Sequence, residues 1–252
     1  MKKNVLKIWG IFILLFLFAS YSSAQELTGN QILEKVDENI GSDNKIVTSE
    51  MIVHGRRGSR TIKSKSWIQG RDKSFTEYLA PAREKGTKML KLGDQLWIYT
   101  PSTDRIIRIS GHMLRQSVMG SDLSYEDMME DPKLQNIYDA EVTGKETYLG
   151  RPAWVIELTA KKDAGVAYYS RKILVDQERF VLLKEERYAK SGTLLKTTEI
   201  DEVMQVQNRW IAKKMTFKDV LKKGKGTEFI ILTIEFNADI PDYIFSKASL
   251  RR

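Results

Sequence analysis

Few side chains in this sequence have the types and spacing that covalent chemistry requires. The chain contains two histidines, His54 and His112, and no cysteine. His112 lies between Ser110 and Ser117, so a triad of serine, histidine and acid is one hypothesis, but the Gly-x-Ser-x-Gly turn that presents many nucleophilic serines is absent. The alternative is that His112 is a surface residue at a helix start and His54 a strand-end residue. The sequence therefore favours a non-enzymatic protein, with no catalytic residues and no cofactor.

An acidic cluster is the other group that could bind a ligand directly. Its members are Asp122, Glu126, Asp127, Glu130 and Asp131. Such carboxylates can hold Ca²⁺, but the alternating ligands around a central glycine that an EF-hand needs are missing. The favoured interpretation is a helix start, where the helix dipole stabilises negative charge, with a solvated face and no metal. A third hypothesis is that these acids pair with Arg105 and Arg108 at a strand end and so hold a helical segment in place.

Apolar side chains in two parts of the chain are candidates for binding a lipid. Methionine is flexible and suits surfaces that accept variable apolar shapes. The alternative interpretation is that the same residues fill the protein's own core. The predicted lipid-binding residues are Trp67, Trp97 and Tyr99 on strands, and Met113, Leu114, Val118, Met119, Leu123 and Met128 in a helical segment.

The elements that must position these residues follow from periodicity and turn signals. Thr28 and Gln31 have capping-box spacing and predict a helix that ends near Ile40. From Lys45 onward the apolar period is two, with short polar turns, which predicts about a dozen antiparallel strands in hairpins. Residues 110–134 interrupt this pattern with helical spacing. The predicted fold is mainly antiparallel β with a few helices, a strongly curved sheet or incomplete β-barrel covered by those helices.

The first 24 residues resemble a secretory signal peptide. Met1 to Lys7 carries three lysines, an apolar run extends from Ile8 to Ala19, and Ser22-Ser23-Ala24 is a small-residue exit. Cleavage after Ala24 would leave residues 25–252, which we expect to form one domain in the periplasm. An uncleaved anchor is the alternative, because 18 uncharged residues separate Lys7 from Glu26. Cleavage would lower the net charge from +8 to +5, a basic excess compatible with an anionic membrane surface.

Two motifs carry a resemblance to a known family. The stretch Ser117 to Asp127 is similar to the MGSD-x-SYED signature of outer membrane lipoprotein-sorting proteins, and Leu96 to Pro101 is similar to the W-x-Y-x-P turn ahead of it. The resemblance covers essentially all of residues 25–252. It implies an open β-barrel of the periplasmic lipoprotein-carrier kind, which holds acyl chains under a helical lid. The residues that match the signature are Gly120, Ser121, Asp122, Ser124, Tyr125, Glu126 and Asp127.

The resulting functional hypothesis is a periplasmic carrier that transfers an acyl chain, a lipoprotein or another lipid towards the outer membrane. Its expected partners are lipid or lipoprotein acyl chains and a membrane exporter or outer-membrane acceptor. We expect a monomer that binds no nucleic acid, because export separates it from that partner. The alternative is an accessory or scaffold protein of an exporter or envelope complex, with a self-filled core. A void under the segment from His112 to Met129 favours the carrier, and a filled interior favours the scaffold.

Overall fold

The computed structural model describes residues 26–55, 58–130 and 133–252. The predicted signal peptide, residues 1–24, lies outside the described residues, so its cleavage stays a prediction. Among the helices of the described ranges, none is long and apolar enough to cross a membrane.

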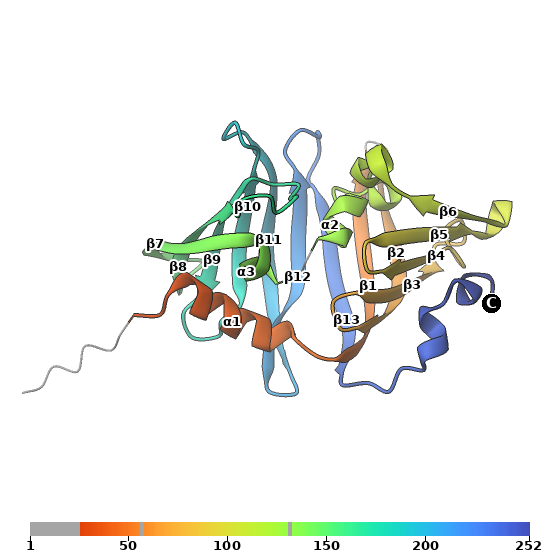
Figure 1. Cartoon of the computed structure of the whole chain (residues 1–252), viewed down its shortest axis with the longest axis horizontal. Coiled ribbons are helices and arrows are strands. Elements are labelled where there is room, and N and C mark those ends of the chain that lie inside the picture. The colour runs from red at the N-terminus through yellow and green to blue at the C-terminus, as the bar shows by residue number, and fades with distance from the viewer. Residues whose placement is uncertain (1–25, 56–57, 131–132) are drawn as a thin grey trace, which may run out of the picture.

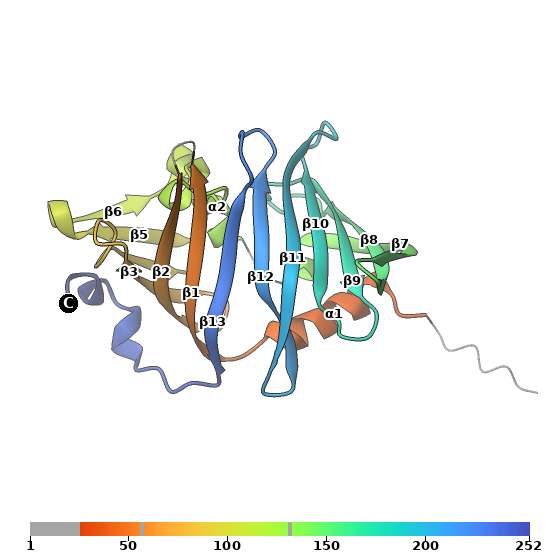
Figure 2. The same cartoon turned by 180° about the vertical axis from the view of Figure 1, so that it is seen from behind.

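The described chain forms one antiparallel sheet of 13 strands in the order β6-β5-β4-β3-β2-β1-β13-β12-β11-β10-β9-β8-β7 (Figures 1 and 2). The predicted antiparallel β class with a few short helices is confirmed. The strands are β1 Asn44–Gly55, β2 Gly58–Gln69, β3 Lys73–Ala80, β4 Lys88–Leu92, β5 Gln95–Thr100, β6 Arg105–Ile109, β7 Tyr138–Tyr148, β8 Arg151–Ala160, β9 Ser170–Asp176, β10 Leu182–Tyr188, β11 Leu194–Val206, β12 Arg209–Asp219 and β13 Thr227–Phe236.

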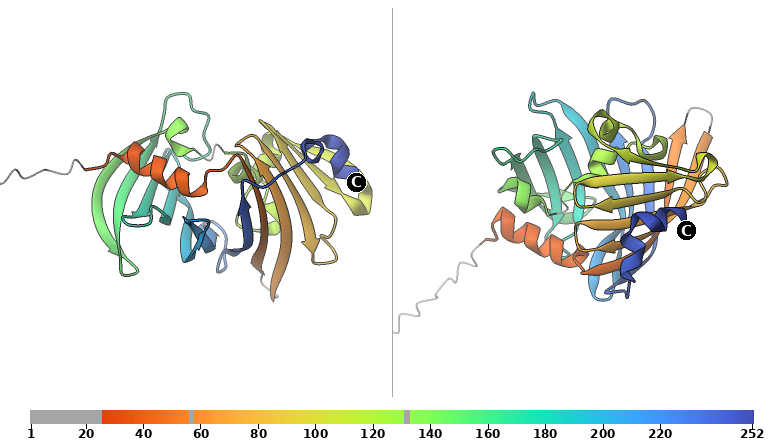
Figure 3. Two further views of the ribbon diagram at one scale, coloured as in Figure 1. Left: turned by 90° about the horizontal axis from the view of Figure 1, so that it is seen from below. Right: turned by 45° about the vertical axis from the view of Figure 1, so that its right-hand side comes forward.

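The sheet consists of two meanders that meet in its middle, where β1 pairs with β13. Strands β6 and β7 form the two edges and lie at opposite ends of the molecule (Figure 3). The barrel is therefore incomplete, as predicted, but the sheet is not strongly curled, which corrects the expected degree of curvature. The chain from β6 to β7 runs across one face of the sheet, which it covers together with the N-terminal helix.

The N-terminal helix α1, Gly29–Ile40, begins at the predicted capping box. The Thr28 hydroxyl accepts a hydrogen bond from the Gln31 amide, and the Gln31 side chain accepts one from the Thr28 amide. Ile32 and Leu33 are buried against strands β7 to β9. Gly29 contacts β7 so closely that a Cβ atom there would lie 2.7 Å from the Ala140 carbonyl oxygen. A side chain at Gly29 would therefore push the helix off the sheet.

The two faces of the sheet have different covers. Because side chains alternate along a strand, Leu96 and Trp97 of β5 point to opposite faces. Leu96 lies on the face that α1 and residues 110–137 cover, here called the helix face. Trp97 lies on the other face, here called the C-terminal face, under the final segment with its 3-10 helices η4 Asp242–Phe245 and η5 Lys247–Arg251. The buried residues of that second cluster are Phe75, Leu90, Trp97, Ala238, Ile240, Phe245 and Leu250.

Candidate ligand-binding cavity

The segment between β6 and β7, residues 110–137, is built from short turns of helix. They are the 3-10 helices η2 Gly111–Arg115 and η3 Val118–Gly120 and the α-helices α2 Tyr125–Met129 and α3 Leu134–Ile137. A second capping box begins α2: the Ser124 hydroxyl accepts a hydrogen bond from the Asp127 amide, and the Asp127 carboxylate accepts one from the Ser124 amide at 2.7 Å. A tight turn precedes it, with Met119 and Gly120 at φ values of 50° and 75°. Glycine adopts the second of these without strain, and methionine adopts the first only at a cost.

Asp122 ties this segment to the hairpin of β12 and β13. Its carboxylate accepts hydrogen bonds from the Thr227 hydroxyl at 2.7 Å and from the Asp219 amide at 3.0 Å. Thr227 is fully buried. The Lys222 ammonium donates to the Ser121 carbonyl at 2.8 Å and to the Ser117 hydroxyl at 2.6 Å. Residues 117–122 are therefore held against the sheet by directed polar contacts.

Asp127 is the centre of a second set of polar contacts, with β10 and β11. Its side chain is 4% exposed. It accepts hydrogen bonds from the Tyr168 hydroxyl at 2.6 Å, from Arg187 at 3.1 Å and from Lys196. A side chain of α2 is thus paired with two cations, Arg187 of β10 and Lys196 of β11.

The ion pairs continue from the end of α2 into the sheet. Glu130 pairs with Arg171 of β9, and Arg171 pairs with Glu185 of β10 at 2.5 Å. Glu185 also pairs with Arg187 at 2.8 Å. We call the resulting group the ionic latch; it consists of Asp127, Glu130, Glu185, Arg171, Arg187 and Lys196. With three carboxylates and three cations, its formal charge is balanced.

The electrostatics keep the ionic latch charged. Burial raises the pKa of the Asp127 carboxyl, but the charges of Lys196 and Arg187 outweigh burial and lower that pKa to about 2. Burial also raises the pKa of the Glu185 carboxyl, but the charges of Arg187 and Arg171 outweigh burial and lower that pKa to about 2. At neutral pH both carboxyls are therefore ionised, and α2 is held by charge-assisted hydrogen bonds.

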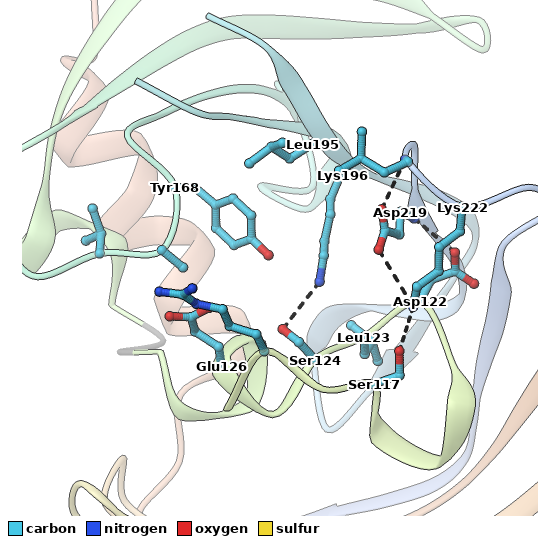
Figure 4. A pocket seen from close by; sticks show the side chains of 14 residues that line it. Ser117, Asp122, Leu123, Ser124, Glu126, Tyr168, Leu195, Lys196, Asp219 and Lys222 are labelled. Carbon is cyan, nitrogen blue, oxygen red and sulfur yellow. Dashed lines mark hydrogen bonds and ion pairs between the residues drawn. The ribbon is translucent and has the colours of Figure 1, made fainter. Parts of the chain in front are cut away.

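A cavity of about 470 Å³ lies between residues 115–126 and strands β11 and β12 (Figure 4). Its lining combines leucine side chains such as Leu123 and Leu195 with the side chains of Tyr168, Lys196 and Lys222. Three cations and three carboxylates line it in all, the cations being Arg115, Lys196 and Lys222 and the carboxylates Asp122, Glu126 and Asp219. Such a lining suits a ligand that has both an apolar and a polar part.

The comparisons with known proteins agree with this fold. A family model described as "-like: Uncharacterized protein" matches residues 70–252. A putative outer membrane lipoprotein-sorting protein domain from Vibrio parahaemolyticus is 26% identical, with a TM-score of 0.76 over 89% of this chain and 98% of that one. A LolA superfamily protein from Nitrosomonas europaea is 25% identical, with a TM-score of 0.74 over 89% of this chain and 100% of that one. In fold and in sequence the chain is therefore similar to outer membrane lipoprotein-sorting proteins of the LolA superfamily.

A DUF1329 family protein from Desulfovibrio piger shares the fold, with a TM-score of 0.81, 23% identity and coverage of 88% of this chain and 97% of that one. No curated protein matches the chain. The predicted resemblance of the chain to lipoprotein-sorting proteins is confirmed as a whole, and the segment that carries the MGSD-x-SYED stretch frames the cavity.

The structure does not bring the nine predicted lipid-binding residues together. Trp67, Trp97 and Tyr99 pack on the C-terminal face. The residues of the helical segment lie on the helix face, and of the nine only Leu123 lines the cavity. The predicted single trough is therefore wrong, because the aromatic residues alternate to the opposite side of the strands.

The methionines of the segment are mostly used for packing. Met113 and Leu114 contact the buried cluster of Met89, Leu96 and Ile109, and Met119 contacts that of Met51, Ile62 and Tyr78. Val118 is buried and Met128 is 38% exposed. On β4 to β6 the segment is thus packed by the protein's own side chains, and the cavity lies beside residues 115–126.

The acidic cluster does pair with basic strand residues, but with different ones from those predicted. Arg105 and Arg108 are exposed on β6, whereas Asp127 and Glu130 pair with Arg171, Arg187 and Lys196. The sequence contained one signal for these partners. Arg171 shares the strand periodicity of Ile173 and Val175, so an inward charge on β9 could have been inferred.

Neither histidine contributes to the cavity. His112 is exposed in η2, and among the described residues it has no hydrogen bond to a serine or an acid. His54 lies between the Ser59 hydroxyl and the Glu228 carboxylate, each at 2.7 Å, an arrangement that the sequence did not predict. Lys214 also pairs with Glu228, at 2.7 Å. Within the described ranges, no three His, Cys, Asp or Glu residues are grouped to hold a metal ion.

Proposed function

We propose that this protein is a non-enzymatic periplasmic carrier, which binds the acyl chain of a lipid or lipoprotein and transfers it towards the outer membrane. The observation that carries this proposal is the cavity of about 470 Å³ framed by the family signature. Its size falls within the range of small-molecule and lipid sites. The periplasmic location rests on the predicted leader, and N-terminal sequencing of protein from the envelope fraction tests cleavage after Ala24.

The mixed lining of the cavity supports an amphiphilic cargo. Leu123, Leu195 and Leu221 offer apolar contact, while Lys196 and Lys222 lie close enough to meet a polar headgroup. Each methylene removed from water contributes about 0.8 kcal/mol. A chain of about ten buried methylenes therefore binds strongly even after the cost of ordering it.

Mass spectrometry of lipids extracted from the protein as purified from its native envelope tests this proposal. Wild-type protein should carry lipid in stoichiometric amount. Leu195→Trp should lower that amount several-fold, because the larger ring fills the cavity. Leu232→Trp is the matched control, since Leu232 is 41% exposed on β13, and it should carry as much lipid as wild type. Wild-type protein free of lipid, or equal lipid in both variants and wild type, contradicts the proposal.

A scaffold role is the second candidate, and one observation favours it. On β4 to β6 the helical segment is packed by Met113, Leu114 and Met129, with no bound molecule needed to complete the core. If preparations lack lipid while chemical cross-linking in the envelope captures one exporter subunit in equal amount, the scaffold interpretation replaces the carrier.

A further inference from the structure

The hairpin tip between β12 and β13, residues 220–226, combines exposed apolar side chains with lysines. Leu221 is 73% exposed and Val220 is 37% exposed. Residues 218–225 contain four lysines and a single aspartate. Lys223 and Lys225 are exposed and have no ion pair within the described part of the chain. Single exposed leucines are common, but a leucine among unpaired lysines matches the chemistry of an anionic membrane surface.

A neighbouring turn presents the same combination. The turn between β10 and β11 points to the same end of the molecule as the β12–β13 tip (Figure 1). It carries Lys190, whose ammonium lies 5.7 Å from the ring centre of Tyr169. Tyr169 is 41% exposed, and tyrosine side chains are enriched where a bilayer meets water. Apolar, aromatic and cationic groups thus gather at one end of the sheet.

We propose that this end of the protein docks on the surface of an anionic phospholipid bilayer. Leu221 and Val220 enter the headgroup region, and Lys223, Lys225 and Lys190 contact the lipid phosphates. Leu221 and Lys222 also line the cavity, so docking places the cavity beside the membrane. The inference goes beyond the proposed function, because surface docking does not require that the cavity hold a lipid.

The expected strength of binding to the bilayer follows from the lysine charges and from Leu221. Each lysine near an anionic bilayer strengthens binding by about fivefold. Removing Lys223 and Lys225 together should therefore weaken binding by about 25-fold. Replacing Leu221 by serine should weaken it by about tenfold, since most of a leucine side chain is no longer transferred from water. Added salt should weaken binding of the wild type, because exposed charges are screened within about 10 Å at 0.1 M.

Co-sedimentation of the exported protein with vesicles tests the proposal. The probes are vesicles of phosphatidylglycerol and phosphatidylethanolamine, with phosphatidylcholine vesicles as the uncharged comparison. The variants are Leu221→Ser and Lys223→Gln/Lys225→Gln. The matched controls are Leu149→Ser, at a leucine 77% exposed in the β7–β8 turn, and Arg83→Gln/Lys85→Gln, which removes the same charge from the β3–β4 connection.

The expected result is salt-sensitive binding of the wild type to the anionic vesicles alone, the stated losses in the two variants, and less than a twofold change in the controls. Absence of wild-type binding, or equal losses in variants and controls, overturns the proposal. Binding to isolated membranes that disappears after protease treatment of those membranes also overturns it, because a protein partner is then the target. Lys223 and Lys225 do not line the cavity, so lipid extracted from wild type and from Lys223→Gln/Lys225→Gln reports on the cavity separately, and failure of docking and failure of cargo binding are distinguishable.

Discussion

Asp127→Asn removes the carboxylate at the centre of the ionic latch with almost no change in shape. Asp127 is 4% exposed and contacts Tyr168, Arg187 and Lys196. Asparagine preserves one acceptor oxygen for the capping contact with Ser124. It leaves Lys196 without its carboxylate partner and Arg187 with Glu185 alone, which is the costly way to disrupt a buried ion pair.

Two estimates bracket the loss of stability. Lowering the pKa of Asp127 from 3.8 to about 2 corresponds to about 2 kcal/mol of stabilisation in the charged state. Removing one member of a buried pair typically costs about 3–5 kcal/mol, because the partners stay buried without compensation. We expect the free energy of unfolding of Asp127→Asn to fall by about 3 kcal/mol at pH 7, a large part of the stability of an ordinary domain.

The pH dependence gives the sharper test. A carboxyl whose pKa is lower in the folded state contributes its full stabilisation above its unfolded pKa, near 4, and loses it as pH falls through the folded value near 2. The difference in stability between wild type and Asp127→Asn should therefore be constant from pH 7 to about 5 and should shrink progressively down to about pH 2.

Urea unfolding followed by circular dichroism from pH 7 to pH 3 measures both quantities. Glu126→Gln is the matched control: Glu126 is adjacent in α2, lines the cavity and has no ion pair within the described residues. It should change the free energy of unfolding by less than 1 kcal/mol. If Asp127→Asn costs less than 1 kcal/mol at pH 7, or if its cost is the same at pH 3 as at pH 7, the ionic latch does not stabilise the fold as described.

Two further substitutions test how much the cap of α1 and the packing of the C-terminal face contribute to stability. Thr28→Ala removes the capping oxygen of α1 and should lower the free energy of unfolding by about 1 kcal/mol in a urea titration, whereas Thr28→Ser should retain the stability. Trp97→Ala should cost about 3–5 kcal/mol, because Trp97 is buried under the C-terminal segment. The lipid content of Trp97→Ala should nevertheless equal that of wild type. A loss of lipid would place the C-terminal face in the binding site.

Local pattern in the sequence predicted the elements well because each depends on near neighbours in the chain. The capping box at Thr28 is present, and a helix does begin within the acidic cluster, at Tyr125. The interruption after Ile109 was also predicted, since methionines at helical spacing cannot alternate as a strand does.

The sheet face on which a residue lies, and the strand or side chain with which it pairs, were not predictable in the same way, because they depend on residues far apart in the chain. The contact of β1 with β13 joins residues more than 170 positions apart, such as Val53 and Thr227. The sequence predicted that Trp97 lines a lipid site. It did not show whether Trp97 and the helical segment lie on the same face of the sheet. The partners of Asp127 lie 60 and 69 positions downstream, at Arg187 and Lys196, and no local pattern connects them.

The segment 110–137 is attached to the sheet by two kinds of interaction, and the difference bears on how cargo could enter. On β4 to β6 it is held by apolar packing of Met113 and Leu114, which water cannot replace. Beside the cavity it is held by the ionic latch, in which the Nε atoms of Arg171 and Arg187 lack a hydrogen-bond partner. Charges released from that latch recover solvation, which offsets much of the lost attraction. Because α2 contributes Asp127 to the latch and Met129 to the apolar packing, a ligand that displaces α2 must separate both kinds of contact.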